Sequence, residues 1–281
     1  MIIFKHSSDL RSYLRTIRFS LQRIGFVPTM GALHEGHLSL IKQSKANAEL
    51  TVCSIFINRA QFNSADDFDK YPVTIESDIR LLESSGCDIL FMPDEKEIYP
   101  DAISKEKKFD LGYLETVLEG KYRPGHFQGV CLIVEKLLYI VEPNVLFLGQ
   151  KDFQQCLVIK RLIQIMGKDI EVHMVPTKRE SDGLAMSSRN LRLNPAERAL
   201  APELNKALTS VKKNILKVEY SGLRRQTIAS LENQGFKVDY LDLADKNTLQ
   251  LLCDPQNKSD LVVLVAAFLN EIRLIDNLLI N

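Results

Sequence analysis

No apolar run in this sequence is long enough to cross a lipid bilayer. The longest covers residues 261–269, whereas a membrane-spanning helix needs about 20 apolar residues. The first residues, Met1 to His6, also lack the charged segment and the long apolar segment of a secretory signal peptide. We therefore expect a cytoplasmic protein that has no membrane partner.

The sequence has no excess of charge of either sign. It contains 36 Lys and Arg residues against 36 Asp and Glu residues, so its formal net charge is zero. Proteins that bind nucleic acids non-specifically usually need a basic field, because Lys and Arg neutralise the phosphates. We therefore expect no nucleic-acid partner, while a local basic site remains open.

Cysteines are few and scattered along the chain. They are odd in number, include no Cys-x-x-Cys pair, and stand at Cys53, Cys87, Cys131, Cys156 and Cys253. This pattern indicates reduced, mostly buried thiols in a cytoplasmic protein.

The part of the chain up to Pro176 alternates between strand-like apolar runs and helical periodicity. We predict strands at residues 25–28, 50–57, 87–92, 145–148 and 170–175, and helices at 8–18, 37–48, 74–85, 125–141 and 152–166. A charged loop is predicted at 101–125, with a short helical piece near 111–118. Such alternation is typical of an α/β fold with a parallel, doubly wound sheet of the Rossmann type.

The pattern changes after Pro176. Helical periodicity at 195–217 and 221–234 precedes strand-like runs at 236–243, 261–269 and 272–279. We therefore predict two domains, a Rossmann-like domain over 1–176 and a smaller α+β domain over 177–281.

A turn rich in glycine and histidine, residues 28–37, follows the first predicted strand. Ligands of open α/β sheets bind beyond the carboxyl ends of the strands. A helix that begins near His37 would point backbone N–H groups at an anion, and His34 lies on the same helical face. Gly36 leaves room for a base or ribose, and Gly31 suits a sharp turn. These features favour a phosphate or nucleotide site.

Two other interpretations of the turn remain open at this point. The histidines could be structural, although an ordinary strand-to-helix turn has no need of two. They could also bind zinc, but the His-x-x-His spacing differs from that of His-Glu-x-x-His, and no third ligand is obvious.

The stretch from Pro28 to His37 resembles the ATP-binding motif of the pantothenate synthetase (pantoate–β-alanine ligase) family. Its last four residues are similar to the His-x-Gly-His signature of the HIGH nucleotidyltransferase superfamily. The resemblance implies that His34 and His37 are catalytic, with His37 described in the family as a proton donor. We favour a hydrogen-bond donor instead, because a helix N-terminus disfavours the imidazolium. The residues implied in ATP binding here are Met30, Gly31, Ala32, Leu33, His34, Glu35, Gly36 and His37.

The second predicted strand ends in Asn58-Arg59-Ala60-Gln61-Phe62, which is similar to the family's Asn-Pro-x-Gln-Phe. A glutamine offers both a donor and an acceptor to a hydroxylated carboxylate ligand. The resemblance implies that Gln61 binds pantoate or β-alanine, together with Met30 and Asn58. Arg59 departs from the family's proline. Nearby, Val73 departs from the arginine of a Tyr-Pro-Arg-Thr pattern.

Two later stretches also resemble family motifs. Residues 149–155 are similar to Gly-x-Lys-Asp-x-Gln-Gln, in which a lysine can neutralise phosphate and an aspartate can accept from a ribose hydroxyl. Residues 187–190, Ser-Ser-Arg-Asn, resemble a mobile phosphate clamp that closes on ATP from the second domain. The resemblance implies ATP contacts from Gly149, Gln150, Lys151, Asp152, Lys178, Met186, Ser187, Ser188 and Arg189, a catalytic role for Lys151, and a pantoate contact from Gln155.

A fifth stretch, residues 123–130, is similar to the family's Gly-His-Phe-x-Gly-Val segment beside the active site. Its His126 could contact phosphate or act as a gate, and a structural role is equally compatible.

Together these motifs imply an AMP-forming ligase. ATP and pantoate would give pantoyl adenylate and pyrophosphate, and β-alanine would then release AMP and pantothenate. The resemblance also implies Mg²⁺ bridging the phosphates and a homodimer through the first domain; no metal ligand is assigned. Three alternatives stay open. They are another nucleotidyltransferase of the superfamily, a non-catalytic nucleotide- or RNA-binding module, and a zinc hydrolase that uses His34 and His37.

Overall fold

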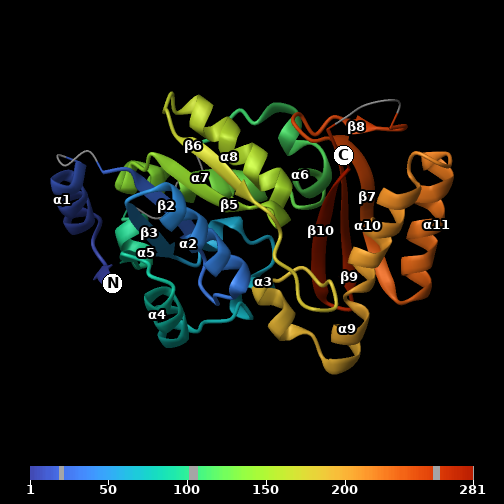
Figure 1. The fold of residues 1–281 in the computed structure, drawn as a ribbon, viewed down its shortest axis with the longest axis horizontal. Coiled ribbons are helices and arrows are strands. Elements are labelled where there is room, and N and C mark those ends of the chain that lie inside the picture. The colour runs from blue at the N-terminus through green and yellow to red at the C-terminus, as the bar shows by residue number, and fades with distance from the viewer. Residues whose placement is uncertain (19–21, 101–106, 256–259, 281) are drawn as a thin grey trace. The chain divides into compact units, whose positions relative to one another are not determined.

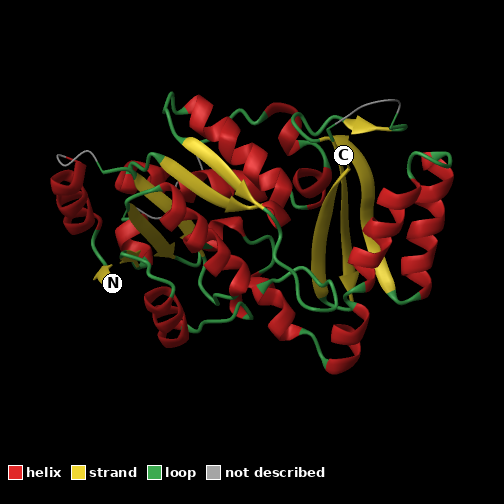
Figure 2. Cartoon of the chain, viewed as in Figure 1, coloured by secondary structure: helices red, strands yellow, loops and turns green. Residues whose placement is uncertain are grey.

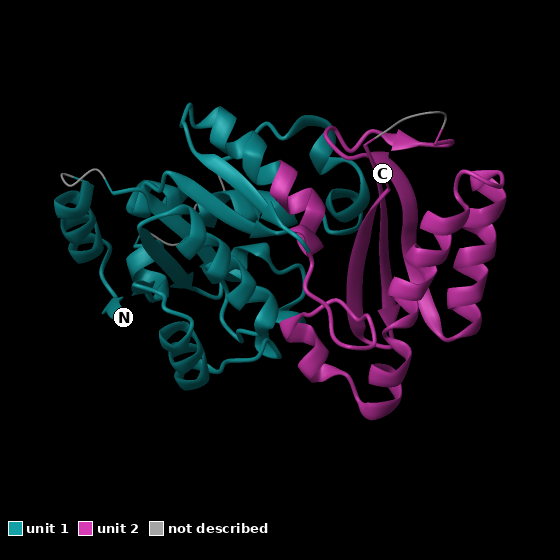
Figure 3. Ribbon diagram, viewed as in Figure 1, with its two compact units in different colours: residues 1–149, 158–176 teal, residues 150–157, 177–281 magenta. Residues whose placement is uncertain are grey.

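The computed structural model describes residues 1–18, 22–100, 107–255 and 260–280. The chain forms two compact units: residues 1–149 with 158–176, and residues 150–157 with 177–281 (Figure 3). This division differs from the predicted ranges 1–176 and 177–281 in residues 150–157, which group with the second unit. The physical reason is that the carbonyls of Gln150 and Lys151 accept hydrogen bonds from Asn277.

The first unit is built on a six-stranded parallel sheet with the strand order β1-β4-β3-β2-β5-β6 (Figure 1). The chain leaves β2 towards β3 and β4, and later returns to the other side of β2 through β5 and β6. This reversal confirms the predicted doubly wound sheet and puts its switch point between β2 and β5. The strands are β1 Ile2–Phe4, β2 Ile24–Thr29, β3 Leu50–Ile55, β4 Ile89–Phe91, β5 Val145–Gly149 and β6 Glu171–Val175.

Both faces of the central strands are buried, which explains their continuous apolar sequences. Val27, Cys53 and Phe147 belong to one buried cluster with Ile41 of helix α2 (Glu35–Asn47) and Leu82 of helix α4 (Ile75–Ser84). The alternate residues of the same strands, Phe26, Val52 and Leu146, are also fully buried, and alternate residues in a strand point to opposite faces.

The helices of this part are α1 Ser7–Arg18, α2 Glu35–Asn47, α3 Ala65–Asp69, α4 Ile75–Ser84, α5 Glu95–Ile98, α6 Leu118–Tyr122, α7 His126–Val141 and α8 Phe153–Ile165, with single 3₁₀ turns η1 Arg59–Gln61, η2 Gly112–Glu115 and η3 Gln150–Asp152. Helices α1, α2, α4, α7 and α8 follow the predicted periodicity, whereas the short helices α3 and α5 were not predicted. Within the loop predicted at 101–125, residues 101–106 lie outside the described residues, and the remainder contains η2 and α6.

The second unit contains a four-stranded antiparallel sheet with the order β10-β9-β7-β8. Figure 2 shows its strands beside the helices that follow η4 Ser188–Arg192. Leu204 and Leu208 of α10 share a buried core with Val263 and Val265 of β9. The elements are α9 Pro195–Leu200, α10 Glu203–Asn214, α11 Tyr220–Asn233, β7 Phe236–Asp245, β8 Leu251–Leu252, β9 Leu261–Leu269 and β10 Ile272–Ile280.

Two details differ from the sequence prediction. The helix expected over 195–217 is divided between α9 and α10, because Pro202 at the junction has no N–H to continue the helical ladder. The helix expected to begin near His37 begins at Glu35. Among the described residues, the helices fall short of the length and apolar character that membrane crossing requires.

Candidate active site

The turn after β2 is held in a left-handed backbone conformation. Gly31 has φ 81° and Ala32 has φ 48°, and the second value is costly for a residue with a Cβ. The carboxylate of Asp78, a residue of α4 that is only 1% exposed, accepts from the N–H groups of Ala32 (2.9 Å) and Leu33 (2.8 Å). It also accepts from the Thr74 hydroxyl at 3.0 Å. The Asp78 carboxylate therefore accepts from two consecutive backbone N–H groups of this turn, those of Ala32 and Leu33.

The sequence prediction did not find Asp78. Its N–H partners lie more than 40 positions away in sequence, so no local motif marks it. Since Asp78 takes the N–H groups of Ala32 and Leu33, an ATP contact from these two residues has to use other atoms. The turn and Asp78 also line a cavity of about 240 Å³.

His34 and His37 cap the first turn of α2 together. His34 is the N-cap residue, and its Nδ1 accepts from the Gly36 N–H at 3.1 Å. His37, three residues into the helix, accepts from the His34 N–H through its own Nδ1 at 3.3 Å. The ring centroids lie 4.1 Å apart, so the structure brings the two predicted imidazoles together.

This capping fixes the tautomer of both rings. A ring nitrogen that accepts from an N–H carries no hydrogen, so each neutral imidazole carries its hydrogen on Nε2. A doubly protonated ring would lose the acceptor that caps the helix. The arrangement therefore presents two neutral Nε2–H donors at the carboxyl end of β2, next to the switch point.

Gln61 lies in η1, and its side-chain amide is held by neighbours in the first unit. Its Oε1 accepts from Asn58 Nδ2 at 3.2 Å, which leaves its Nε2 to approach the sulfur of Met30 at 2.9 Å. Asn58 is 1% exposed; its Nδ2 also donates to the Gly129 carbonyl, and its Oδ1 accepts from the Tyr99 hydroxyl. Burial raises the pKa of Tyr99, so the phenol keeps the proton that it donates.

Helix α7 supports the backbone of the same loop. The Gln61 carbonyl lies 2.7 Å from His126 Nδ1, and His126 Nε2 lies 3.1 Å from a guanidinium nitrogen of Arg123. A carbonyl can only accept and a guanidinium can only donate, so Nδ1 carries the hydrogen. A Cβ on Gly129 would lie 2.1 Å from the Ala60 carbonyl oxygen, so only glycine allows this approach. The motif at 123–130 thus contacts the Gln61 loop.

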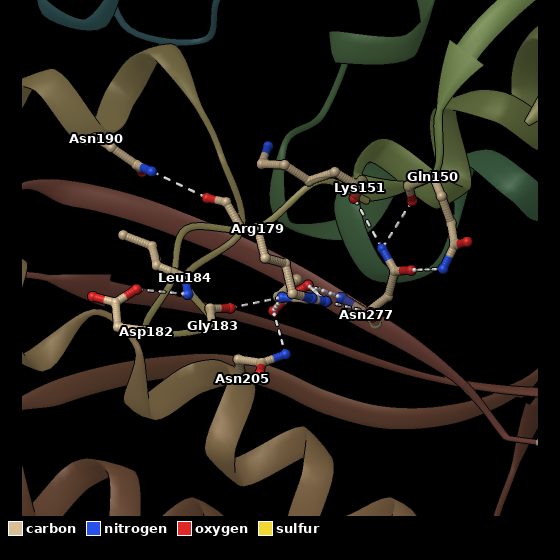
Figure 4. A network of polar contacts seen from close by, with 11 residues as sticks. Gln150, Lys151, Arg179, Asp182, Gly183, Leu184, Asn190, Asn205 and Asn277 are labelled. Atoms are coloured by element: carbon tan, nitrogen blue, oxygen red, sulfur yellow. Dashed lines mark hydrogen bonds and ion pairs between the residues drawn. The ribbon is translucent and has the colours of Figure 1, made fainter. Parts of the chain in front are cut away.

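In the second unit, the stretch after Gly149 is fixed through its backbone (Figure 4). Asn277 Nδ2 donates to the carbonyls of Gln150 (3.0 Å) and Lys151 (2.9 Å), and Asn277 Oδ1 accepts from Gln150 Nε2 at 3.1 Å. The Lys151 ammonium lies 3.8 Å from Asp152, a loose ion pair. Gln155 follows in the first turn of α8 and is half-buried.

The Ser-Ser-Arg segment follows a short hairpin of the second unit. Lys178 and Met186 face each other, since the Met186 N–H donates to the Lys178 carbonyl at 3.0 Å. Ser187 then caps η4, with its Oγ accepting from the Arg189 N–H, and Ser188 is buried. The predicted residues of this unit therefore lie in three local structures, the η3 turn, the first turn of α8, which holds Gln155, and this hairpin with η4.

A metal site built from protein side chains finds no support in the part of the chain that the structure describes. It contains no group of three or more His, Cys, Asp or Glu side chains that could hold a metal ion. The Nδ1 atoms of His34 and His37 are also engaged by backbone N–H groups. The zinc interpretation of the turn therefore loses its basis.

The whole chain is similar to known proteins of one family. A family model described as pantoate-beta-alanine ligase matches residues 2–279. A pantothenate synthetase of Cytophaga hutchinsonii is 43% identical over 100% of this chain and 99% of its own, and one of Neisseria meningitidis is 44% identical over 94% and 95%. The crystal structure of pantothenate synthetase from Thermus thermophilus matches with a TM-score of 0.88 at 36% identity, covering 100% of this chain and 99% of that one. The pantoate-beta-alanine ligase of Francisella tularensis, complexed with β-γ ATP and β-alanine, matches with a TM-score of 0.82 at 36% identity over 99% and 97%.

Proposed function

The chain belongs to the pantoate–β-alanine ligase family and condenses pantoate with β-alanine through pantoyl adenylate, and on this premise we propose which residues carry the reaction. In the first step a pantoate carboxylate oxygen bonds to the α-phosphorus of ATP, and pyrophosphate leaves. In the second, the β-alanine amine bonds to the acyl carbon and AMP leaves. No covalent bond to the protein is required, so the protein aligns the reactants and stabilises developing charge.

His34 and His37 bind the phosphates of ATP as neutral hydrogen-bond donors. The observation that carries this assignment is the capping geometry, in which both Nδ1 atoms accept from backbone N–H groups, so that each neutral ring has its hydrogen on Nε2. Gly36, between them, leaves space for the nucleotide. Met30, Gly31, Ala32, Leu33 and Glu35 complete the first ATP segment.

Gln61 binds pantoate or β-alanine with its amide. Its orientation is already set by Asn58, so little side-chain entropy is lost on binding. Asn58 is buried, and it acts on the substrate through Gln61. The Met30 sulfur contacts the Gln61 amide, so Met30 lies where the substrate would bind Gln61 and is proposed to contact it as well. Gln155 is the second pantoate contact.

The second unit supplies the cationic groups for ATP. Lys151 is a point charge for phosphate, and Arg189 offers a forked cation beside the hydroxyls of Ser187 and Ser188. Asp152 accepts from ribose. The remaining ATP contacts proposed here are Gln150, Lys178 and Met186 of this unit and Gly149 at the end of β5 in the first unit.

Mg²⁺ enters with ATP. Magnesium keeps several waters and would be held mainly by the ATP phosphates, with one or two carboxylates. When bound, the ion neutralises phosphate charge. We also propose a cytoplasmic homodimer formed through the first unit, which sedimentation equilibrium of the purified protein tests: a monomer at micromolar concentration contradicts it.

Exchange of labelled pyrophosphate into ATP tests the proposed assignments. Reversal of the adenylation step makes exchange strictly dependent on pantoate and independent of β-alanine. Exchange without pantoate, or exchange that requires β-alanine, contradicts the adenylate route. Substitution of Gln61 should raise the pantoate concentration needed for half-maximal exchange, whereas substitution of Lys151 should raise the ATP concentration needed.

A further inference from the structure

Strand β10 lies at one edge of the antiparallel sheet, and among the described strands it pairs only with β9. Open strand edges carry backbone groups that need partners. Two consecutive residues of β10, Asp276 and Asn277, are only 4% and 1% exposed. Their side chains form hydrogen bonds with Arg179 and with the η3 turn. Buried polar side chains of this kind require full hydrogen bonding.

Asn277 is bonded at every polar atom of its side chain (Figure 4). Its Nδ2 donates to the carbonyls of Gln150 and Lys151, and its Oδ1 accepts from Gln150 Nε2. Asn277 therefore holds the main chain of the η3 turn, and its hydrogen bonds do not involve the Lys151 ammonium.

Asp276 holds the hairpin that leads into η4. Its two oxygens accept from the two terminal nitrogens of Arg179, at 2.7 and 2.9 Å, which is a bidentate pair. Arg179 also donates to the Gly183 carbonyl at 3.1 Å and to the Asn277 carbonyl at 3.3 Å. The Arg179 backbone forms a β-bridge with Ala185, two residues before Ser187. Through Arg179, the Asp276 carboxylate therefore holds the loop at Gly183 and the β-bridge between Arg179 and Ala185.

The two residues are also bonded to each other, since the Asn277 N–H donates to Asp276 Oδ1 at 2.7 Å. We infer that Asp276 and Asn277 are a pair of positioning residues, which set the place of the Lys151 turn relative to the Ser187–Arg189 segment for ATP. The inference rests on the proposed role of these two segments in ATP binding. The pair acts through their main chain and does not itself touch ATP.

A double-mutant cycle on ATP binding tests the part of the inference that concerns Asn277. Asn277→Leu, which keeps the volume and removes the donors, should weaken ATP binding measured by calorimetry about tenfold, because the Lys151 ammonium is no longer held in place for the phosphates. In a Lys151→Met background the same substitution should cost less than about twofold, because the ammonium that it positions is gone.

The outcomes separate the inference from the proposed function. An equal loss in both backgrounds, or no loss in either, overturns the positioning role of Asn277 alone. Unchanged ATP affinity in Lys151→Met overturns the proposed role of Lys151 and, with it, this part of the inference. Asn247→Leu, on an exposed turn of the same unit, is the matched control and should leave the ATP affinity unchanged.

The part of the inference that concerns Asp276 is tested in the same way. Asp276→Asn keeps the shape and removes the charge that pairs with Arg179, and its effect on ATP affinity should shrink in an Arg189→Met background. Thermal unfolding of every variant identifies those that fail to fold. If Asn277→Leu is one of them, Asn277→Ser, which leaves room for a water, takes its place with the same expected coupling to Lys151.

Discussion

One buried carboxylate, that of Asp78, determines the shape of the turn before the two histidines. It accepts three hydrogen bonds, from the Ala32 and Leu33 N–H groups and the Thr74 hydroxyl. These bonds offset the cost of the left-handed Ala32, about 1–2 kcal/mol for a residue with a Cβ. Helix α2 begins at Glu35, directly after this turn, so Asp78 also sets where the capping histidines lie.

Replacing Asp78 by Asn tests this role. The amide turns an NH₂ group towards at least one N–H donor, so we expect a loss of about 1–3 kcal/mol in the free energy of unfolding. We also expect a larger drop in pyrophosphate exchange than the loss of folded protein explains. Urea denaturation and exchange at saturating ATP measure the two effects. Asp66→Asn, an exposed acidic residue of α3, should change neither. Wild-type exchange in stable Asp78→Asn protein would contradict the role.

The histidine substitutions separate hydrogen-bond donation from proton donation. Loss of one donor to developing phosphate charge typically costs 10²–10³ in rate, so His37→Ala should lose roughly this much exchange activity. His37→Gln can still donate a hydrogen bond but has no acidic proton, and should lie between His37→Ala and wild type. A glutamine variant as inactive as the alanine variant supports a proton donor instead. A near-wild-type rate for His37→Gln would contradict the proton donor, and a near-wild-type rate for His37→Ala would contradict both roles.

At this scale the sequence identifies residues that belong to contiguous motifs. His34, Gln61 and Lys151 each stand in a contiguous stretch that resembles a motif of the family. Asp78 and Asn277 do not, because the segments that they hold, the turn after β2 and the η3 turn, lie 45 to 127 positions away in sequence. A single sequence carries no signal for such pairs, and only the folded backbone brings them together.

At the scale of the elements, α7 lies close enough to η1 for glycine to be necessary. A Cβ at position 129 would lie 2.1 Å from the Ala60 carbonyl oxygen and 2.8 Å from the Gln61 nitrogen, both backbone atoms that cannot rotate away. Asn58 and His126 bond across the same contact. The helix therefore fixes the height of Gln61 above the sheet.

Gly129→Ala should push η1 away from α7. We expect a loss of about 1–3 kcal/mol in the free energy of unfolding, as for other overpacked contacts, and a higher KM for pantoate with a smaller change in KM for ATP. Gly222→Ala in α11 is the matched control, because its Cβ meets nothing within 4 Å and alanine favours helix by up to about 1 kcal/mol. Equal KM values for pantoate in the two variants would contradict this account.

Most elements could be predicted because their apolar period is sustained. Helix α7, expected over 125–141, is observed as His126–Val141. Strand β1 was not predicted, since its three residues are too few to show a period. The division between α9 and α10 was missed because the apolar period continues through Pro202, where the proline overrides it.

At the scale of the whole molecule, the fold class follows from the order of the elements, and the strand order confirms it. The grouping of residues 150–157 with the second unit does not follow from that order. Because β5 leads directly into η3 and α8, the sequence predicts that residues 150–157 belong to the first unit. The hydrogen bonds of Asn277 to the η3 backbone, made from the last strand of the chain, decide the grouping instead.

The packing of the whole chain also determines the chemistry of its thiols. Burial raises the pKa of Cys53, and it raises those of Cys87 and Cys131 to about 12, from an ordinary value of 9.0. Cys253 is exposed. Brief treatment of the native protein with iodoacetamide at pH 8 should therefore label Cys253, whereas the protein in urea should be labelled at every cysteine. Mass spectrometry of the digested protein gives the labelled positions.

The same shifts predict how stability depends on pH in the alkaline range. The unfolded chain releases its thiol protons from about pH 9.0, whereas the folded protein holds those of Cys87 and Cys131 to about pH 12. The unfolded state therefore binds fewer protons in this window, and the free energy of unfolding falls as the pH rises through it. Cys87→Ala and Cys131→Ala should each flatten this slope in urea titrations at pH 8 to 10.5, although each creates a cavity. An unchanged slope, or native labelling of Cys87 at the rate of Cys253, would show that these thiols are not protected by the fold.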